Sequence, residues 1–300
     1  MYRILIPYIL FCFLSTCLTG QVESGSVKIK GGNLSYRIWG DGEPVVFLNG
    51  GPGFASDGYE NYAIELAKYR RVILFDQRGT GKSKNKYCCQ FYITEMTKDL
   101  EKLREHLGFE KWDVFGHSFG GTYAQYYIAQ FPKSINKVIL SASPCSIIAQ
   151  GKYQKFKDIK PENRTPLENT IAAAYYEGLE KKIHRDSLKK IYNANWSRYY
   201  VSKAENYSKV AYWFLNSSNP SSVNIEFNFR RKKLEKRLKE FTRPVLIIHG
   251  LNDFINIANP LRLHEFFPNS ELKIIEDSGH IMSIDNPQEY FKAIREFLEK

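Results

Sequence analysis

The sequence predicts an α/β fold, with a mostly parallel central sheet and a helical cap inserted between two of its strands. Short apolar runs recur along the chain, several of them with consecutive β-branched residues, as in strands that are buried on both faces. They lie at residues 45–48, 72–75, 114–115, 138–140, 245–249 and 272–275. Helical periods separate most of them, which is the order typical of a parallel sheet. From residue 146 to residue 242 the strands stop, and the pattern becomes helical, basic and rich in Tyr and Trp.

The composition is that of a protein with a packed core. Of the 300 residues, 43% are hydrophobic and 25% are charged, which excludes intrinsic disorder. The sequence has no repeat at a fixed period, which excludes solenoids and propellers. After residue 20, no apolar stretch approaches the length of a membrane span. We expect an α/β core made of residues 21–145 and 243–300, with residues 146–242 inserted as the cap.

The N-terminus resembles an export signal. A short basic start is followed by an apolar run over residues 4–14 and by small or polar residues up to Gly20, which is the order of a signal peptide over residues 1–20. We therefore expect an exported protein that is secreted, periplasmic or attached to the cell envelope by a lipid. Residues 14–17 loosely resemble a bacterial lipobox, in which Cys17 is the lipidated residue, although Thr16 departs from the usual Gly or Ala. Lipidation of Cys17 and its loss with the signal peptide remain alternatives.

The first expected element of the core is a hairpin, because the apolar runs 27–29 and 34–38 flank Gly31-Gly32-Asn33. Helices are then expected wherever apolar residues recur at helical spacing between a start signal and a stop signal. In the core these segments are 97–107, 118–131 and 287–298, and in the cap they are 171–183 and 230–241.

The net charge of +11 is concentrated in the cap. Residues 152–243 hold 21 basic and 10 acidic side chains, so the remainder of the chain is neutral. Many of the basic residues lie on the expected helix 230–241, at a spacing that fits one exposed face. We expect a solvated surface there, with contact to an anionic envelope surface as the alternative. We expect no nucleic-acid partner, because an exported protein rarely meets nucleic acid.

The cysteines and histidines do not have the spacing of a metal site, so we expect no metal and no cofactor. Three cysteines follow the expected signal peptide, namely Cys88, Cys89 and Cys145. A disulfide that joins Cys145 to one of the other two remains open.

The segment 116–120 carries the clearest chemical signal. Its sequence, Gly-His-Ser-Phe-Gly, matches G-x-S-x-G and lies between an apolar run ending at Phe115 and the helix expected from Ser118. A sharp strand-to-helix turn leaves no room for side chains at the flanking positions, which explains the glycines, and it raises the serine hydroxyl into a cleft. The motif predicts that Ser118 is a nucleophile.

A nucleophilic serine needs a base and a carboxylate that orients the base. Asp253 follows the apolar run at 245–250, and His280 follows the run at 272–275, so both are expected at strand ends on one edge of the sheet. There His280 would take the proton of Ser118, and Asp253 would hold the imidazole. Asp277 and His249 are disfavoured alternatives, because Asp277 is too close to His280 in sequence and His249 lies within a strand.

Acyl transfer also needs two backbone N–H donors for the oxyanion. One is expected from Phe119, the residue after the nucleophile. The other is expected from the glycine-rich loop 49–53, in which we choose Gly51 because a missing side chain lets the backbone approach the substrate. We expect Arg78, in a nearby loop, to brace that loop through hydrogen bonds to backbone or carboxylate oxygens.

These motifs together resemble the proline iminopeptidase (prolyl aminopeptidase) family of α/β hydrolases. The resemblance rests on NGGPG at 49–53, DQRGTGKS at 76–83, GHSFGG at 116–121, the loop of Asp253, and SGH at 278–280. It implies the α/β-hydrolase fold and a serine peptidase that releases an N-terminal residue, often proline, from short peptides. It also implies the triad Ser118, Asp253 and His280, with oxyanion donors at Gly51 and Phe119.

Two positions depart from the family pattern. Asn49 stands where the family loop usually begins with His, and we treat it as a candidate substrate-binding residue. Family members hold the free amine of the substrate with acidic residues of the cap or beside the catalytic Asp, and some carry Glu where this chain has Phe254. Glu226 is the best acidic candidate in the cap by position, and Glu177 and Glu205 are weaker ones.

The sequence therefore predicts hydrolysis through an acyl-Ser118 intermediate, with the N-termini of short peptides as the first-choice substrates and small molecules as the general class. An esterase or amidase acting on small apolar acyl groups is the alternative within the same chemistry. It is favoured by the aromatic cap and by the absence of Glu after Asp253. A non-catalytic ligand-binding protein on the same fold is the alternative from another class, and the complete triad argues against it.

Overall fold

The computed structural model describes residues 21–86, 90–147, 166–182, 184–218, 221 and 223–300. The expected signal peptide with Cys17, and the cysteines at 88 and 89, lie outside the described residues, so export, lipidation and the disulfide remain predictions. No helix within the described ranges is long and apolar enough to cross a membrane.

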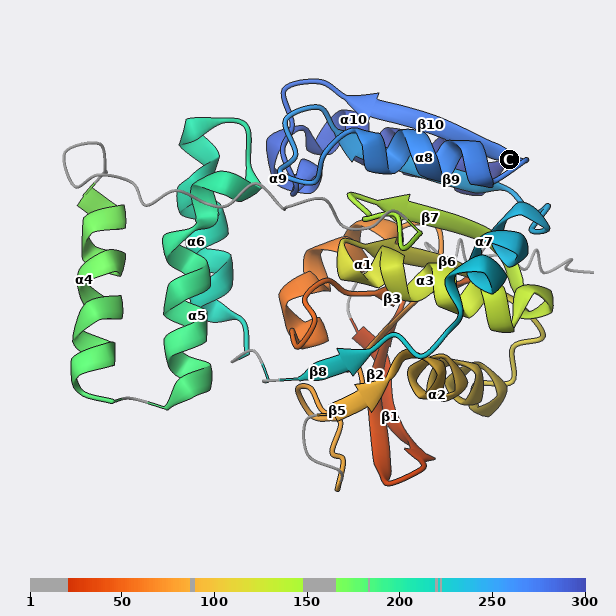
Figure 1. Ribbon diagram of the computed structural model, residues 1–300, viewed down its shortest axis with the longest axis horizontal. Coiled ribbons are helices and arrows are strands. Elements are labelled where there is room, and N and C mark those ends of the chain that lie inside the picture. The colour runs from red at the N-terminus through yellow and green to blue at the C-terminus, as the bar shows by residue number, and fades with distance from the viewer. Residues whose placement is uncertain (1–20, 87–89, 148–165, 183, 219–220, 222) are drawn as a thin grey trace, which may run out of the picture.

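Eight strands form the central sheet (Figure 1). They are β1 (Gln21–Ile29), β2 (Gly32–Trp39), β3 (Pro44–Leu48), β4 (Arg71–Phe75), β6 (Trp112–His117), β7 (Ile135–Ser141), β9 (Val245–Gly250) and β10 (Ser270–Ile275). Their spatial order is β1-β2-β4-β3-β6-β7-β9-β10. The hairpin β1–β2 is antiparallel, and so is the pair β2–β4, whereas every neighbouring pair from β4 to β10 is parallel. The predicted α/β fold with a mostly parallel sheet is confirmed.

Helices cover both faces of this sheet. They are α1 (Glu60–Leu66), α2 (Ile93–His106), α3 (Phe119–Gln130), α8 (Ala258–Phe266), α9 (Met282–Asp285) and α10 (Pro287–Glu299). Strand β3 shows why its sequence is apolar throughout. Val46 and Leu48 belong to the buried cluster that also contains residues of α2, α3 and α8, whereas Val45 and Phe47 belong to the cluster with α1 and α10 on the other face. Successive side chains of a strand point to opposite faces, so a strand covered on both sides has no polar face.

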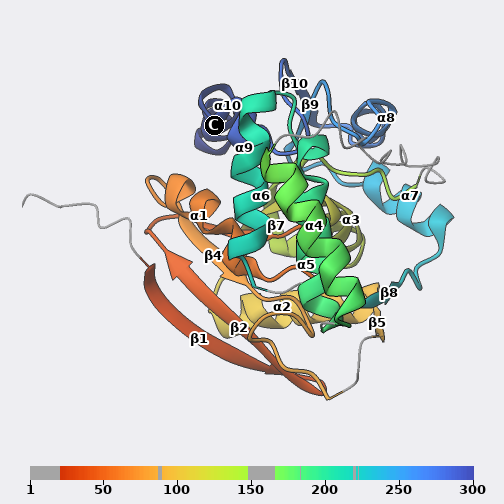
Figure 2. The same cartoon turned by 90° about the vertical axis from the view of Figure 1, so that its left-hand side faces the viewer.

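Three helices form a separate layer, at the left of Figure 1 and in front of the sheet in Figure 2. We call α4 (Pro166–Glu180), α5 (Arg185–Asn195) and α6 (Tyr207–Asn216) the cap helices. Short 3-10 turns at Ser197–Tyr200 and Ala204–Asn206 connect α5 to α6. The cap helices share an apolar cluster that includes Ile171, Ala194 and Phe214, together with Ile281 from the core. Helices were predicted in this region, and α4 begins five residues before the start expected from periodicity.

The last part of the predicted insertion packs on the core instead of the cap helices. Strand β8 (Asn224–Glu226) pairs in parallel with β5 (Gln90–Tyr92) to form a small second sheet. Helix α7 (Arg231–Lys239) buries Leu234 and Leu238 in the same cluster as α2 and α3. The spacing of apolar residues identifies the buried side of a helix but not the surface it meets, so the sequence could not separate α7 from the cap.

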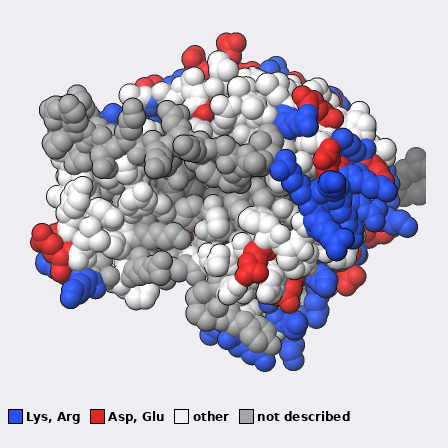
Figure 3. Space-filling model, viewed as in Figure 1, with Lys and Arg blue, Asp and Glu red and all other residues white. Residues whose placement is uncertain are grey.

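Basic side chains gather over α7 (Figure 3). This helix and the residue before it carry Arg230, Arg231, Lys232, Lys233, Lys236, Arg237 and Lys239. Three of them form ion pairs along the same helix: Lys236 and Arg237 with Glu240, and Lys239 with Glu235. The expected exposed basic face is therefore present, opposite the buried side of α7.

Candidate active site

Ser118 occupies a sharp turn between β6 and α3. Its backbone has φ 55° and ψ −122°, a conformation that L-residues rarely adopt. The glycines around it leave space for this turn: a Cβ on Gly120 would lie 1.8 Å from the carbonyl oxygen of Leu48, and one on Gly116 would lie 2.5 Å from that of Gly120. The strand–turn–helix context expected from the motif is thus present, with a serine at its apex.

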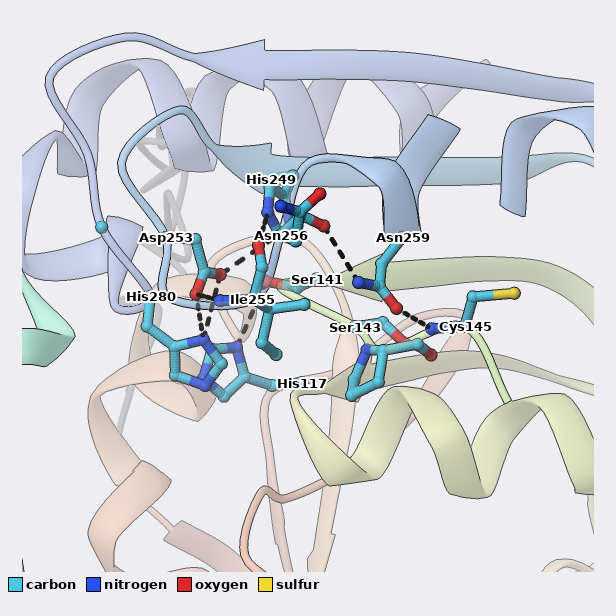
Figure 4. Close-up of polar contacts among 12 residues, drawn as sticks. His117, Ser141, Ser143, Cys145, His249, Asp253, Ile255, Asn256, Asn259 and His280 are labelled. Atoms are coloured by element: carbon cyan, nitrogen blue, oxygen red, sulfur yellow. Dashed lines mark hydrogen bonds and ion pairs between the residues drawn. The ribbon is translucent and has the colours of Figure 1, made fainter. Parts of the chain in front are cut away.

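His280 and Asp253 lie in contact. Nδ1 of His280 is 3.0 Å from each carboxylate oxygen of Asp253, and both side chains are buried, with 3% and 0% exposure (Figure 4). The backbone N–H of Ile255 also donates to Asp253, at 2.8 Å, which fixes the carboxylate in its loop. Because Nδ1 faces Asp253, the other ring nitrogen of His280 is left for a reacting group. Asp277, the alternative partner, is exposed.

A cavity of about 740 Å³ lies between the sheet edge and the cap helices and is bordered by both Ser118 and His280. Gly51 and Phe119, the expected oxyanion donors, also border it. The structure therefore brings four of the predicted residues together around one space, with Asp253 behind His280. Most of the remaining lining is aromatic or aliphatic. The aromatic members are Phe54, Tyr59, Tyr192, Tyr200, Trp213, Phe227 and Phe254.

The glycine-rich loop presents Gly51 in a way that explains its residue type. Gly51 has φ 130°, and a Cβ there would lie 2.8 Å from the backbone nitrogen of Gly53. The N–H of Gly50 is already used, since it donates to the hydroxyl of Tyr59 at 3.1 Å. Phe119 is the first residue of α3, where N–H groups have no partner within the helix. Gly51 and Phe119 both border the cavity, so they remain the candidate donors for an oxyanion.

The two expected substrate-binding residues, Asn49 and Glu226, do not line the cavity. Asn49 is fully buried, and its amide donates to the carbonyl oxygen of Phe54 at 2.8 Å, so it holds the glycine-rich loop from behind. Glu226 accepts a hydrogen bond from Gln90 at the β5–β8 pair, while its neighbours Ile225 and Phe227 border the cavity. Asn224 also borders the cavity, so Glu226 is the one residue of β8 that does not.

The weaker acidic candidates lie outside the cavity as well. Glu177 pairs with Lys181 on the outer surface of α4, and Glu205 is exposed. Among the described lining residues there is no Asp or Glu. The site therefore presents no described carboxylate for a substrate amine.

Three aromatic rings surround His280. The ring of Phe254 lies 4.4 Å from it, that of His117 5.1 Å and that of Tyr200 5.7 Å. Burial, and secondarily the charge of His280, lower the pKa of His117 well below its usual value, so His117 stays neutral. Nδ1 of His117 lies 3.3 Å from the hydroxyl of Ser141. Sequence reasoning missed His117 and Tyr200, because nothing in a linear pattern indicates which rings a fold gathers.

His249 supports the loop of Asp253 from within β9 (Figure 4). Its Nε2 lies 2.9 Å from the carbonyl oxygen of Ile255, which can only accept, so this nitrogen carries the proton. Its Nδ1 lies 3.8 Å from Asp253. Burial lowers the pKa of His249, which keeps the ring neutral. The sequence placed His249 in the strand core, and the structure agrees.

Arg78 braces the neighbouring loop as expected. Its guanidinium binds the two oxygens of Asp99 at 2.6 and 2.7 Å and the carbonyl oxygen of Lys30 at 3.0 Å. In the same loop, Asp76 accepts hydrogen bonds from the N–H and the hydroxyl of Ser56, both at 2.8 Å. These bonds tie the loop after β4 to the 3-10 turn that follows the glycine-rich loop.

Comparison with known proteins gives one family and a consistent set of relatives. The sequence matches the family model described as alpha/beta hydrolase fold over residues 43–287. Among curated proteins it is 29% identical over 292 residues to a proline iminopeptidase of Arabidopsis thaliana, an alignment that covers 86% of this chain and 75% of the relative. It is 26% identical to a proline iminopeptidase of Heyndrickxia coagulans, covering 91% and 98% of the two chains.

Solved structures show the same fold. The esterase EaEST from Exiguobacterium antarcticum superposes with a TM-score of 0.67 at 20% identity, covering 91% of this chain and 97% of its own. An alpha/beta fold family hydrolase from Bacillus anthracis gives a TM-score of 0.68 at 20% identity, covering 93% and 100%. The resemblance to the proline iminopeptidase family that the motifs predicted is confirmed, and the chain belongs to the alpha/beta hydrolase fold family.

Proposed function

We propose that this protein is a serine hydrolase that works through an acyl-Ser118 intermediate. His280 takes the proton of the Ser118 hydroxyl as the oxygen attacks a substrate carbonyl, and Asp253 stabilises the resulting imidazolium. The backbone N–H groups of Gly51 and Phe119 bind the oxyanion. His280 then gives its proton to the leaving group. In the second half of the reaction, His280 takes a proton from a water molecule as the water oxygen attacks the acyl carbon, and it returns that proton to the Ser118 oxygen as the bond to the acyl group breaks.

The observation that carries this proposal is the buried His280–Asp253 pair, at 3.0 Å, behind a cavity that Ser118 borders from a strained turn. An isolated histidine or serine is common, but this combination matches the requirements of nucleophilic catalysis.

Labelling with a fluorophosphonate tests the nucleophile directly. We expect wild-type protein to be labelled and to hydrolyse p-nitrophenyl esters, and Ser118→Ala to do neither. Ser270→Ala, at the start of edge strand β10, is the matched control and should keep both properties. Labelling or turnover that survives in Ser118→Ala would exclude the mechanism. Absence of both from folded wild-type protein would favour the non-catalytic alternative.

For the substrate, our first choice is the N-terminus of short peptides, with release of the first residue in the manner of a prolyl aminopeptidase. The support is the similarity to curated proline iminopeptidases along most of the chain. The cavity volume of about 740 Å³ suits a short peptide or another small molecule.

An esterase or amidase for apolar acyl groups is the second candidate, and the cavity lining favours it. A buried ammonium group needs a compensating partner, and no described lining residue is acidic. The faces of Trp213, Tyr200 and Phe54 could still bind a cation through their π systems.

A panel of matched substrates separates these candidates. A peptidase of this type should cleave prolyl-β-naphthylamide and lose most of that activity when the proline nitrogen is acylated. An apolar acyl hydrolase should cleave p-nitrophenyl esters and N-acylated amides at least as well as free aminoacyl amides. Ester turnover without any amide turnover would end the peptidase proposal.

We propose in addition that the protein is exported and that residues 1–20 are its signal, on the evidence of their sequence alone. Expression in a bacterial host followed by mass measurement of the mature chain tests this. A measured mass that matches a chain beginning after Gly20 indicates cleavage and secretion. A Cys17 that incorporates labelled palmitate, lost in Cys17→Ala, indicates a lipid anchor, and an intact N-terminus in the cytoplasm contradicts both.

A further inference from the structure

We propose that the hydroxyl of Tyr59 is a third hydrogen-bond donor to the substrate oxyanion, alongside the N–H groups of Gly51 and Phe119. The inference rests on the proposed acyl transfer at Ser118 and adds a side-chain donor to it. Tyr59 would thus be a catalytic residue, since its proton contacts the reacting oxygen.

Tyr59 lies at the right place in the fold. It ends the 3-10 turn Ser56–Tyr59, which begins three residues after the glycine-rich loop, and it borders the cavity although only 3% of its surface is exposed. A Cβ placed on Gly50 would be 2.8 Å from the Tyr59 hydroxyl and 3.2 Å from Cβ of Ser118. The Tyr59 hydroxyl and the side chain of Ser118 therefore lie next to each other, beside the same face of Gly50.

The hydrogen bonding of Tyr59 leaves its proton available. The phenolic oxygen accepts the N–H of Gly50 at 3.1 Å, so its role in that bond is that of an acceptor. A phenol has one proton to donate, and no residue in the described part of the chain accepts it. Burial is the main cause of a strongly raised pKa at Tyr59, so the group remains a neutral donor at any working pH.

The ring is held in place by its neighbours. Tyr59 packs against Phe47 at 5.3 Å, Trp213 at 5.4 Å and Tyr62 at 5.9 Å between ring centres, so contacts come from the sheet, the cap and α1. A donor fixed in this way needs no reorganisation when charge develops, which is the condition under which such groups accelerate a reaction. Trp213 in turn donates to the carbonyl oxygen of Gly58, which holds the cap side of this contact.

The role requires no proton transfer by Tyr59. As the Ser118 oxygen forms its bond to the carbonyl carbon, the π electron pair of the carbonyl moves to its oxygen, and the Tyr59 O–H stays covalently intact while its hydrogen bond to that oxygen strengthens. When the tetrahedral intermediate collapses, the pair returns and the leaving group takes its proton from His280. Removing one such donor typically lowers kcat by about 100- to 1000-fold.

Tyr59→Phe tests the proposal, because it removes the hydroxyl and keeps the ring. We expect kcat on a p-nitrophenyl ester to fall by about 100-fold with KM changed by less than about threefold. Affinity for a trifluoromethyl ketone, whose hydrated or serine-bound form mimics the oxyanion, should fall by a similar factor. Affinity for the carboxylic acid product should not fall with it.

Tyr62→Phe is the matched control. Tyr62 is an equally buried neighbour whose hydroxyl accepts from Ser283 at 2.7 Å, and it does not border the main cavity. We expect it to keep kcat within about threefold of wild type, with any loss confined to thermal stability. A comparable fall in kcat for both variants would show that general packing, and not a donor, is responsible.

Other outcomes separate this inference from the function on which it rests. If Ser118→Ala abolishes hydrolysis while Tyr59→Phe keeps wild-type kcat, the inference is wrong and the serine mechanism stands. If Tyr59→Phe weakens the product and the ketone equally, loss of the Gly50 contact has displaced the loop, and the inference is again wrong. Hydrolysis that persists in Ser118→Ala overturns the proposed function itself.

Discussion

The carboxylate of Asp285 accepts a hydrogen bond from the backbone N–H of Gly279 at 2.8 Å, one residue before His280. The same carboxylate accepts from the backbone N–H of Ser202 at 2.7 Å and from the side-chain amide of Asn206 at 3.0 Å. Asp285 is only 4% exposed. One buried acid therefore ties the chain that enters the cap helix α6 to the loop that carries the candidate base.

Asp285→Asn should loosen this junction. The amide keeps the shape, but its NH₂ group would face donors that the carboxylate now satisfies, which costs about 1 to 3 kcal/mol of unfolding free energy. We expect a lower kcat as well, since the loop of His280 loses its anchor. Urea unfolding and ester kinetics measure the two effects. Glu289→Gln, at a more exposed acid on α10, is the control, and equal behaviour of the two variants would contradict this prediction.

Phe254→Glu should change the choice of substrate. Phe254 packs on His280 at 4.4 Å and borders the cavity, at the position where some relatives of the proline iminopeptidase type carry Glu. A carboxylate there would give a substrate ammonium group an ionic partner. We expect the ratio of turnover of free to N-acylated prolyl-β-naphthylamide to rise at least tenfold. Phe254→Gln, which adds polarity without charge, should leave that ratio near the wild-type value, and a rise in both variants would exclude charge as the cause.

Asp113→Asn should stabilise the protein at neutral pH. Asp113 lies buried in β6, where burial raises its pKa to about 6, against opposing effects of Arg70 and Lys137. A carboxyl whose folded-state pKa exceeds its unfolded value of 3.8 contributes stability fully below that value, and the contribution is lost as pH rises through about 6. The amide imitates the protonated form and can still accept from the N–H of Lys137.

Urea unfolding at pH 4.5 and pH 7.5 measures this difference. We expect Asp113→Asn to gain on the order of 1 to 3 kcal/mol over wild type at the higher pH and much less at the lower pH. Asp41→Asn, at an exposed acid that pairs with Arg71, is the control and should show no such pH dependence. The same gain in unfolding free energy at both pH values would mean that folding does not raise the pKa of Asp113.

The sequence predicted the fold, and it pointed to the candidate triad residues that the structure brings together, because the signals for both are local. Runs of β-branched residues identify strands that are buried on both faces. Glycine is required at positions 116 and 120 because a Cβ at either position would clash with backbone atoms. Asp253 and His280 could be assigned because each follows a strand end, and parallel strands present their carboxyl ends on one edge.

The remaining features depend on packing between distant segments, which the linear pattern does not contain. Tyr59 borders the cavity from the 3-10 turn Ser56–Tyr59, and Tyr200 borders it from the 3-10 turn between α5 and α6. Asn49 was expected to contact substrate because of its place in the motif, but a buried amide satisfies backbone oxygens first. Helix α7 has a buried side that would fit either the cap or the core, and only the structure shows that α3 covers it.

Ser118→Gly should separate stability from activity at the proposed nucleophile. The serine has φ 55° and ψ −122°, which costs a residue with a Cβ about 1 to 3 kcal/mol, whereas glycine adopts such angles easily. Glycine also loses more backbone entropy on folding, which offsets up to about 1 kcal/mol of that relief.

Both Ser118→Ala and Ser118→Gly remove the hydroxyl, so both should be inactive. We therefore expect Ser118→Gly to unfold at higher urea concentration than Ser118→Ala, by about 1 kcal/mol. If the alanine variant is equally stable or more so, the turn is not strained in solution, and its glycines serve only to clear space around the hydroxyl.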